Sequence, residues 1–168
     1  MIRLKNFTKL SNEETIRVLS WRNHPKIAPF MNNTLVSQKE HLEFLASLKT
    51  SLDKEYFLVY NEEIPIGVID FIDIKRGDSC EFGIYSNPNL SGCGKLLMEI
   101  LLEYAFNNLK VKEIKAQVQC ENIKAMKLYA KFGFIKIGEK MMNNKKLNLI
   151  KLDSLFYYSS GGGGAINP

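Results

Sequence analysis

The sequence has few cysteines and no long apolar run, and each absence excludes a class of protein. Its three cysteines, Cys80, Cys93 and Cys120, are odd in number and lack CxxC spacing. This pattern argues against a disulfide framework or a zinc site and favours a reducing compartment. No apolar run approaches the roughly 18 residues of a membrane span, and the first residues lack the apolar core of a signal peptide. We therefore expect a cytoplasmic protein that binds neither a metal nor a membrane.

No linker divides the chain of 168 residues. A chain of this length fits one domain and buries about 70% of the surface that it exposes when unfolded. We expect this domain to span residues 1–158. Residues 159–168 contain a run of glycines that is typical of an appended or disordered tail.

The chain carries an excess of positive charge but has no arginine-rich run. It contains 23 Lys and Arg against 18 Asp and Glu, for a formal charge of +5. That balance suits an anionic small molecule such as coenzyme A or a nucleotide sugar, and it is also typical of a solvated basic surface. Because the lysines are scattered, we do not expect nucleic acid as a partner.

Capping signals and hydrophobic spacing predict four helices. Capping boxes formed by Ser11 with Glu14 and by Ser37 with Glu40 open two early helices, which run to about Arg22 and Lys49. The apolar face of the second helix is expected at Leu42, Leu45 and Leu48. Apolar positions at helical spacing predict a third helix over residues 95–108, and a short fourth helix contains Tyr129.

Period-two patterns predict a sheet around these helices. Residues 1–7 alternate, and segments 56–60, 65–74 and 80–85 are separated by turn-like sequences, which indicates an antiparallel meander. Segment 113–120 follows a helix and should pair in parallel with 80–85. Segments 135–142 and 146–158 are predicted to form a closing hairpin. The expected fold class is therefore α/β (α+β), with a central mixed, mostly antiparallel sheet flanked by helices.

A pair of glycines, Gly92 and Gly94, lies between a predicted strand and a predicted helix. Such a loop exposes backbone N–H groups at a helix N-terminus, where the unpaired donors and the positive end of the dipole favour a pyrophosphate. Glycine allows the ligand to approach the backbone because no Cβ stands in the way. On its own the pair is weak evidence, since glycines that open helices are common.

A second motif, Asn122-Ile-Lys-Ala-Met-Lys-Leu-Tyr-Ala-Lys-Phe-Gly-Phe134, lies about thirty residues downstream. Together the two motifs resemble those of the GNAT superfamily of acyl-CoA N-acyltransferases. That family's loop reads Gln/Arg-x-x-Gly-x-Gly/Ala, and its later helix reads Asn-x-x-Ala-x-x-x-Tyr-x-x-x-Gly-Phe. One position departs, because Asn89 stands where the family usually has Gln or Arg.

The resemblance implies a GNAT fold in which two central strands splay apart and acetyl-CoA, the acetyl donor, binds between them. It implies cofactor contacts from the strand before the loop, from the loop with the start of its helix, and from the later helix. These residues are Phe82, Gly83, Ile84 and Tyr85, then Asn89, Leu90, Ser91, Gly92, Cys93, Gly94, Lys95 and Leu96, and finally Asn122, Ala125 and Tyr129. Gly83 fits either a close approach of backbone or a bulge, or it is simply a weak point in the strand. Cys93 is a small filler or a nucleophile, although no His or acid lies beside it in sequence.

Tyr129 is the candidate general acid. A phenol with a pKa near 10 stays protonated at neutral pH and can give its proton to the departing thiolate, while a backbone N–H polarises the thioester carbonyl. On a helix Tyr129 shares a face with Asn122 and Ala125. A core tyrosine that only fills space is the alternative. Candidates for the base or for a water relay are Asp70, Glu81, Gln117, Gln119 and His41, although strand acids such as Asp70 and Glu81 are more often surface charges.

The acceptor is indicated by resemblance alone. Trp21-Arg22-Asn23 and the loop through Phe30-Met31-Asn32 resemble the branch of the superfamily that contains ribosomal-protein N-terminal acetyltransferases. The whole chain is more similar to the aminosugar N-acetyltransferases of pseudaminic acid biosynthesis, which acetylate the 4-amino group of a UDP-linked dideoxy sugar for flagellin glycans. A site for that acceptor requires a cationic side chain to bind the phosphates and an apolar patch to contact the face of the sugar that carries the methyl group. The candidates are Arg22, Phe30, Met31, His41, Phe44 and Tyr85. Arg22 can instead complement a helix dipole, and aromatic residues near a sheet are usually core. A peptide acetyltransferase and a non-catalytic acyl-CoA-binding module remain open, and an exposed edge strand could pair in a homodimer.

Overall fold

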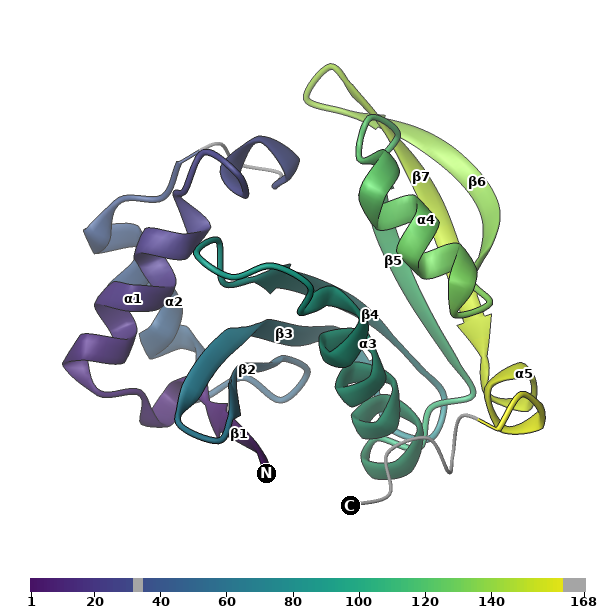
Figure 1. Ribbon diagram of the computed structural model, residues 1–168, viewed down its shortest axis with the longest axis horizontal. Coiled ribbons are helices and arrows are strands. Elements are labelled where there is room, and N and C mark those ends of the chain that lie inside the picture. Colours follow the sequence, from purple (N-terminus) through teal and green to yellow (C-terminus); the bar gives the residue numbers. More distant parts are fainter. Residues whose placement is uncertain (32–34, 162–168) are drawn as a thin grey trace.

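A seven-stranded sheet forms the centre of the computed structural model, which describes residues 1–31 and 35–161 (Figure 1). In spatial order its strands are β1 (Ile2–Asn6), β2 (Glu55–Asn61), β3 (Ile64–Lys75), β4 (Ser79–Ser86), β5 (Glu113–Gln119), β7 (Lys145–Asp153) and β6 (Ile135–Met142). Each neighbouring pair is antiparallel except β4 and β5, which are parallel. The predicted mixed, mostly antiparallel sheet is therefore confirmed.

The four predicted helices are present, and a fifth, α5, was not predicted. They are α1 (Asn12–Arg22), α2 (Gln38–Leu48), α3 (Gly94–Glu103), α4 (Ile123–Lys131) and α5 (Ser154–Ser159), with single 3₁₀ turns at Phe7–Lys9 and Ala28–Phe30. Both predicted capping boxes are present, so each satisfies two backbone donors at its helix start. The third helix is α-helical only to Glu103 and continues as a π-helical turn over Tyr104–Asn108. Among the described residues no helix is both long enough and apolar enough to cross a membrane.

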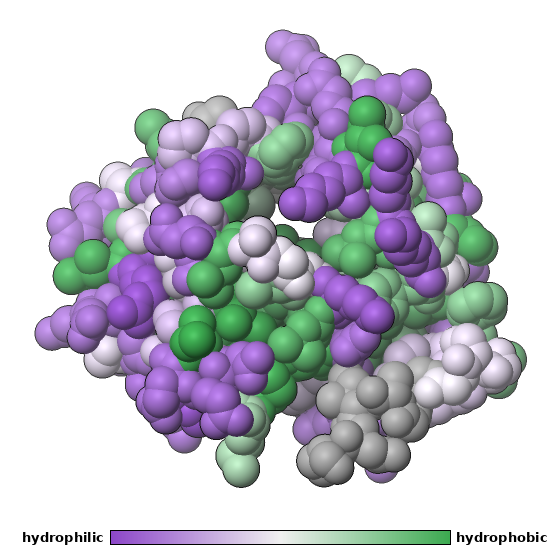
Figure 2. All heavy atoms as spheres, in the orientation of Figure 1, coloured by the Kyte–Doolittle hydropathy of each residue, from purple (hydrophilic) through white to green (hydrophobic). Residues whose placement is uncertain are grey.

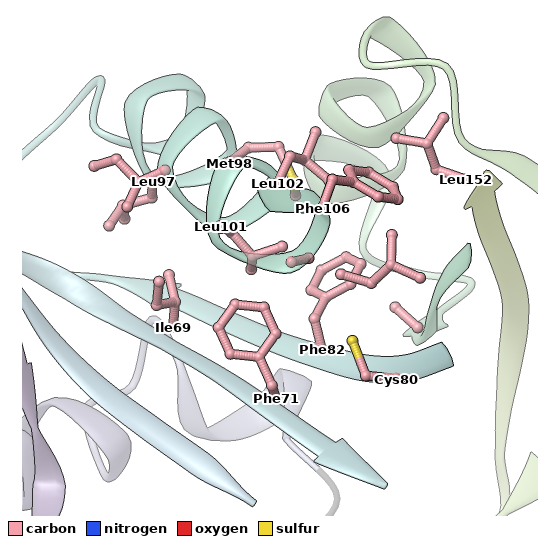
Figure 3. Close-up of a cluster of buried hydrophobic side chains, with 14 of the residues drawn as sticks. Ile69, Phe71, Cys80, Phe82, Leu97, Met98, Leu101, Leu102, Phe106 and Leu152 are labelled. Carbon is pink, nitrogen blue, oxygen red and sulfur yellow. The ribbon is translucent and has the colours of Figure 1, made fainter. Parts of the chain in front are cut away.

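Helices cover the two faces of the sheet with separate apolar clusters. On one face α3 buries Leu97, Met98 and Leu101 against β3 and β4, as Figure 3 shows. Each such side chain contributes about 1.5–3 kcal/mol relative to an exposed one. On the other face α1 and α2 pack through Val18, Trp21 and neighbouring residues against Leu58 and Val68. The sheet is thus the middle layer of three.

The predicted apolar face of α2 is partly wrong. Leu42 is half exposed, whereas His41 and Leu48 are buried and Phe44 and Leu45 pack against the cluster on that face. These four residues follow the i, i+3, i+4, i+7 spacing of one helical stripe. The stripe includes the polar His41 because its ring nitrogen Nε2 lies 3.2 Å from the Thr15 carbonyl oxygen of α1, which satisfies it in the interior.

The prediction of a strand over residues 146–158 is wrong for its last five residues. β7 ends at Asp153, and residues 154–159 form α5 instead of continuing the hairpin to 158. The Asp153 side chain accepts a hydrogen bond from the Phe156 backbone N–H at 2.8 Å and so caps the helix. The aromatic residues of this segment favour a strand, but the Asp153 cap stabilises the start of a helix there. The helix passes the expected domain boundary by one residue, and residues 162–168 of the expected tail lie outside the described residues.

The two halves of the sheet separate between β4 and β5. These strands pair at Ser79–Glu113, Cys80–Ile114 and Glu81–Lys115, and beyond Glu81 they diverge (Figure 1). β4 stays paired with β3 as far as Ser86, and β5 stays paired with β7 as far as Gln119. The diverging part of β4, residues 82–86, therefore has peptide groups that point toward the gap. Figure 2 shows apolar residues gathered around a hollow between the two halves.

Candidate active site

The glycine loop leads directly from the diverging end of β4 into α3. Asn87 fixes the loop: its side-chain nitrogen donates to the Pro65 carbonyl at 2.9 Å, and its side-chain oxygen accepts from the Asn89 backbone N–H at 2.9 Å. Gly92 has a backbone φ of +78°, a value that residues with a side chain rarely adopt. Cys93 is the N-cap residue of α3 and makes no side-chain capping bond. No side-chain cap therefore occupies the first backbone donors of α3, and their binding of an anion stays a prediction.

The cap of α4 also has the predicted form. The Asn122 side-chain oxygen accepts from the Ala125 backbone N–H at 3.2 Å, which leaves the side-chain nitrogen of Asn122 available to a ligand amide. Tyr129, two turns later, is buried, and its ring meets the Phe82 ring of β4 edge to face with centroids 5.5 Å apart. Burial raises the pKa of the Tyr129 phenol, and the charge of Asp70 raises it further. The phenol therefore stays protonated throughout the neutral range.

The fold brings the two sequence motifs together. A Cβ built on Gly94 would lie 3.3 Å from Leu128 Cδ2, so α4 packs beside the start of α3. Ala125 and Cys93 are partly buried against the same cluster, which gives Cys93 the position of a filler. The glycine loop, the diverging part of β4 and the Tyr129 helix thus border one gap. This is the arrangement that a thioester cofactor lying between β4 and β5 requires.

Four of the five candidate bases lie on one face of the sheet at this gap. Glu81 stands opposite Lys115 in the parallel pair, so Gln117 and Gln119 share its face. The Gln117 side-chain nitrogen lies 3.5 Å from a Glu81 carboxylate oxygen, across the gap. Asp70 of β3 lies on this face too. The fifth candidate, His41, lies between α1 and α2, where burial lowers its pKa and its ring bonds to Thr15.

Arg22, at the end of α1, lies on the same side of the sheet as Asp70. It is half-buried, and burial lowers its pKa while the neighbouring phenols of Tyr85 and Tyr56 favour its charge. Met31, Phe44 and Tyr85 are partly buried in the cluster between this face and the two helices, whereas Phe30 is 43% exposed. Tyr56 was not among the residues predicted from sequence. Its alternation with Leu58 and Tyr60 could have placed it on the helix-facing side of the strand.

The segment between α1 and α2 connects the two halves of the sheet. The Pro29 carbonyl oxygen accepts hydrogen bonds from the Gln119 side-chain nitrogen at 3.1 Å and from Lys145 Nζ at 2.8 Å. On the other side Lys26 Nζ donates to the Pro88 carbonyl, at the start of the glycine loop, at 3.2 Å. No sequence pattern predicts these contacts, because they join segments 62 to 116 residues apart. Gln119, a candidate for the water relay, has its amide nitrogen engaged here.

Comparisons with known proteins agree with this geometry. A family model described as "Acetyltransferase (GNAT) domain" matches residues 4–135. The chain is 49% identical over 134 residues, 80% of its length and 85% of the relative's, to "Acetyltransferase PseH" of Campylobacter jejuni subsp. jejuni strain 81-176. The crystal structure of the C. jejuni N-acetyltransferase PseH in complex with acetyl coenzyme A superposes with a TM-score of 0.77 at 40% identity, covering 92% of this chain and 99% of that one. Spermidine N-acetyltransferase from Vibrio cholerae, at 22% identity and a TM-score of 0.81 over 94% of this chain and 98% of that one, shares the fold.

Proposed function

This chain belongs to the GNAT family of acetyltransferases, and we propose that it moves acetyl from acetyl-CoA to the 4-amino group of a UDP-linked amino-dideoxy sugar, UDP-4-amino-4,6-dideoxy-N-acetyl-altrosamine. The observation that carries this proposal is the 49% identity to acetyltransferase PseH over most of both chains. The sequence resemblance to the aminosugar acetyltransferases of pseudaminic acid biosynthesis supports the same acceptor. Binding of acetyl coenzyme A by the 40% identical PseH supports the donor.

The proposed reaction uses the gap between β4 and β5. The pyrophosphate of acetyl-CoA would lie on the open backbone donors that start α3, and the pantetheine chain would run beside residues 82–86. Backbone N–H groups of β4 that point into the gap can stabilise negative charge on the thioester oxygen as the amine attacks. Tyr129 of α4, whose ring contacts Phe82 at the diverging end of β4, would protonate the thiolate that leaves.

The acceptor would approach from the side of the sheet that carries α1 and α2. Arg22 would bind the nucleotide phosphates, and Met31, Phe44 and Tyr85 would contact the apolar face of the sugar. Tyr56 belongs to the same cluster, with its ring 4.8 Å from that of Phe44. This arrangement places a cation beside apolar rings, and a nucleotide sugar that carries a methyl group needs both.

A panel of acceptors tests the proposal. The purified protein is incubated with acetyl-CoA and, separately, with the UDP-4-amino sugar, other UDP-amino sugars, spermidine and a ribosomal N-terminal peptide, and the free thiol is measured. We expect fast thiol release with the UDP-4-amino sugar and little with the others. Preferred acetylation of spermidine or the peptide would reject the nucleotide-sugar assignment and leave the GNAT chemistry intact.

Arg22→Ala is expected to raise the KM for the UDP-sugar about fivefold, which corresponds to about 1 kcal/mol for one lost ionic contact. The KM for acetyl-CoA should stay nearly unchanged, because the cation is assigned to the acceptor. Steady-state kinetics with each substrate varied in turn measures both constants. The matched control is Arg17→Ala, which removes an arginine of the same helix that pairs with Glu13 on the surface. Equal changes in both constants for Arg22→Ala would return Arg22 to a structural role.

A further inference from the structure

Asp70 occupies the middle of a row of three residues that crosses three strands. The register places Tyr56 of β2 opposite Asp70 of β3, and Asp70 opposite Gly83 of β4. Residues directly opposite in antiparallel strands point to the same face. The Asp70 side chain therefore has the Tyr56 ring on one side and a residue without a side chain on the other.

Gly83 gives the Asp70 carboxylate room to lie over β4. A Cβ at position 83 would stand 2.4 Å from Asp70 Oδ2, closer than real Cβ contacts, and a tight 3.0 Å from its Cγ, so the carboxylate would have to move. The pairing of β3 and β4 is regular from Gly67 to Ile72, so Gly83 marks a close approach rather than a bulge. β4 is also the strand that borders the gap beyond Glu81. The Asp70 carboxylate, which belongs to the neighbouring strand β3, thus reaches over β4 to the edge of the gap.

The groups around Asp70 raise its affinity for a proton above that of an ordinary carboxylate. Burial raises the pKa of Asp70 to about 7, a hydrogen bond with the Gly83 backbone opposes that rise, and the charge of Glu81 adds to it. The charge of Asp70 raises the pKa of three phenols, those of Tyr56 of β2, Tyr85 of β4 and Tyr129 of α4, and Arg22 of α1 interacts with the first two. None of the cationic groups in the described residues forms an ion pair with Asp70 that would hold it ionised.

We propose that Asp70 is the general base that takes the proton from the acceptor amine, reaching the gap between β4 and β5 across Gly83. This inference rests on the proposed acetyl transfer, but it does not depend on which amine is the acceptor. The amine nitrogen bonds to the thioester carbonyl carbon while its N–H proton passes to an Asp70 oxygen. The C–S bond then breaks, and the sulfur takes the phenolic proton of Tyr129. One proton moving through water from Asp70 to Tyr129 restores both residues.

Asp70 and Tyr129 are coupled in the direction that this sequence of steps needs. The negative charge of Asp70 raises the pKa of the Tyr129 phenol. When Asp70 accepts the proton of the amine, that charge disappears, and the phenol becomes a stronger acid just before the thiolate leaves. Activation of the amine therefore assists protonation of the sulfur.

An acceptor-free measurement tests the first requirement. In protein labelled with ¹³C at aspartate carboxyl carbons, the Asp70 resonance is identified by its loss in Asp70→Asn and is then titrated. We expect a midpoint near pH 7. A midpoint near 4, the ordinary value for aspartate, would overturn the proposal, because such a carboxylate is too weak a base for this task.

Kinetics tests the role itself, with whichever amine of the acceptor panel the wild-type enzyme acetylates. Asp70→Asn should lower turnover by about 10²-fold with acetyl-CoA affinity retained. For the wild type, kcat/KM should rise with pH up to about 7, because only the ionised carboxylate accepts a proton. For Asp70→Asn, kcat/KM should no longer show this dependence on the Asp70 ionisation, and its pH profile should follow only the ionisation of the acceptor amine. The matched control is Asp73→Asn, an exposed position of the same strand, which should behave as wild type.

Two further variants keep the test decisive. Gly83→Ala retains Asp70 but places a Cβ where its carboxylate lies, so it should lower turnover too and move the acid limb. Glu81→Gln changes the other carboxylate on this face. If Glu81→Gln abolishes the acid limb while Asp70→Asn keeps it and stays within about threefold of wild type, Glu81 is the base and the proposal fails. A change of preferred acceptor in the panel, by contrast, affects only the proposed function.

Discussion

Tyr129→Phe is expected to lower turnover by on the order of 10²-fold or more, the usual range for a positioned general acid. The substitution removes one oxygen and keeps the ring, which packs against Phe82 and Phe134. Acetyl-CoA affinity should change far less, because the hydroxyl matters mainly as charge builds on the sulfur. An interaction made chiefly in the transition state lowers turnover rather than binding.

The measurement is single-turnover acetylation at a pH where chemistry limits the rate, together with titration calorimetry for acetyl-CoA. Tyr157→Phe is the matched control, because Tyr157 is also buried and its ring stacks on Phe106 with centroids 4.6 Å apart, away from the gap. The control should turn over as wild type does. If Tyr129→Phe also stays within about threefold of wild type, Tyr129 is a packing residue and the thiolate leaves without its help.

Gly92→Val is expected to weaken acetyl-CoA binding by about tenfold or more, equivalent to about 1.4 kcal/mol. Two effects act together. A β-branched residue at a φ of +78° is strained by about 1–3 kcal/mol unless the loop shifts, and a shifted loop no longer aims its N–H groups at the pyrophosphate. A side chain on the loop also keeps the phosphates away from the backbone.

Gly77→Val separates strain from lost binding. Gly77 lies in the turn between β3 and β4, has the same φ of +78°, and likewise has nothing within 4 Å of a built Cβ. We expect the two variants to lose similar thermal stability and only Gly92→Val to lose affinity in calorimetry. An unchanged dissociation constant for Gly92→Val, or an equal loss in both variants, would remove the loop from the cofactor site.

The features that the sequence predicted correctly depend on residues a few positions apart. A capping box needs only a serine and a glutamate three residues later, so the starts of α1 and α2 follow from Ser11 and Ser37 with their partners. The Asn122 cap and the open start of α3 after Gly92 are equally local. The parallel pairing of β4 with β5 follows from a general rule on strand–helix–strand connections.

The errors have physical causes outside the pattern of each segment. Its apolar side chain predicts that Leu42 faces the interior, but the buried stripe of α2 depends on its contacts with α1, where the Thr15 carbonyl forms a hydrogen bond with His41. Aromatic residues after Asp153 favour a strand, yet one side-chain cap turns them into α5. The contacts of Pro29 with Gln119 and Lys145 could not be predicted, because no local preference relates such distant segments.

By itself the sequence determined the family, the two motifs and the order of the elements as far as β7. These features depend on short spacings between residues, which act in the same way in any tertiary surroundings. Only the tertiary structure decided that the Asp70 carboxylate lies over β4, next to the gap. In the sequence Asp70 is one of several strand acids, and Gly83 fits a close approach, a bulge or a weak point in the strand. The register of three strands makes them neighbours, and that register is fixed by packing both faces of the sheet at once.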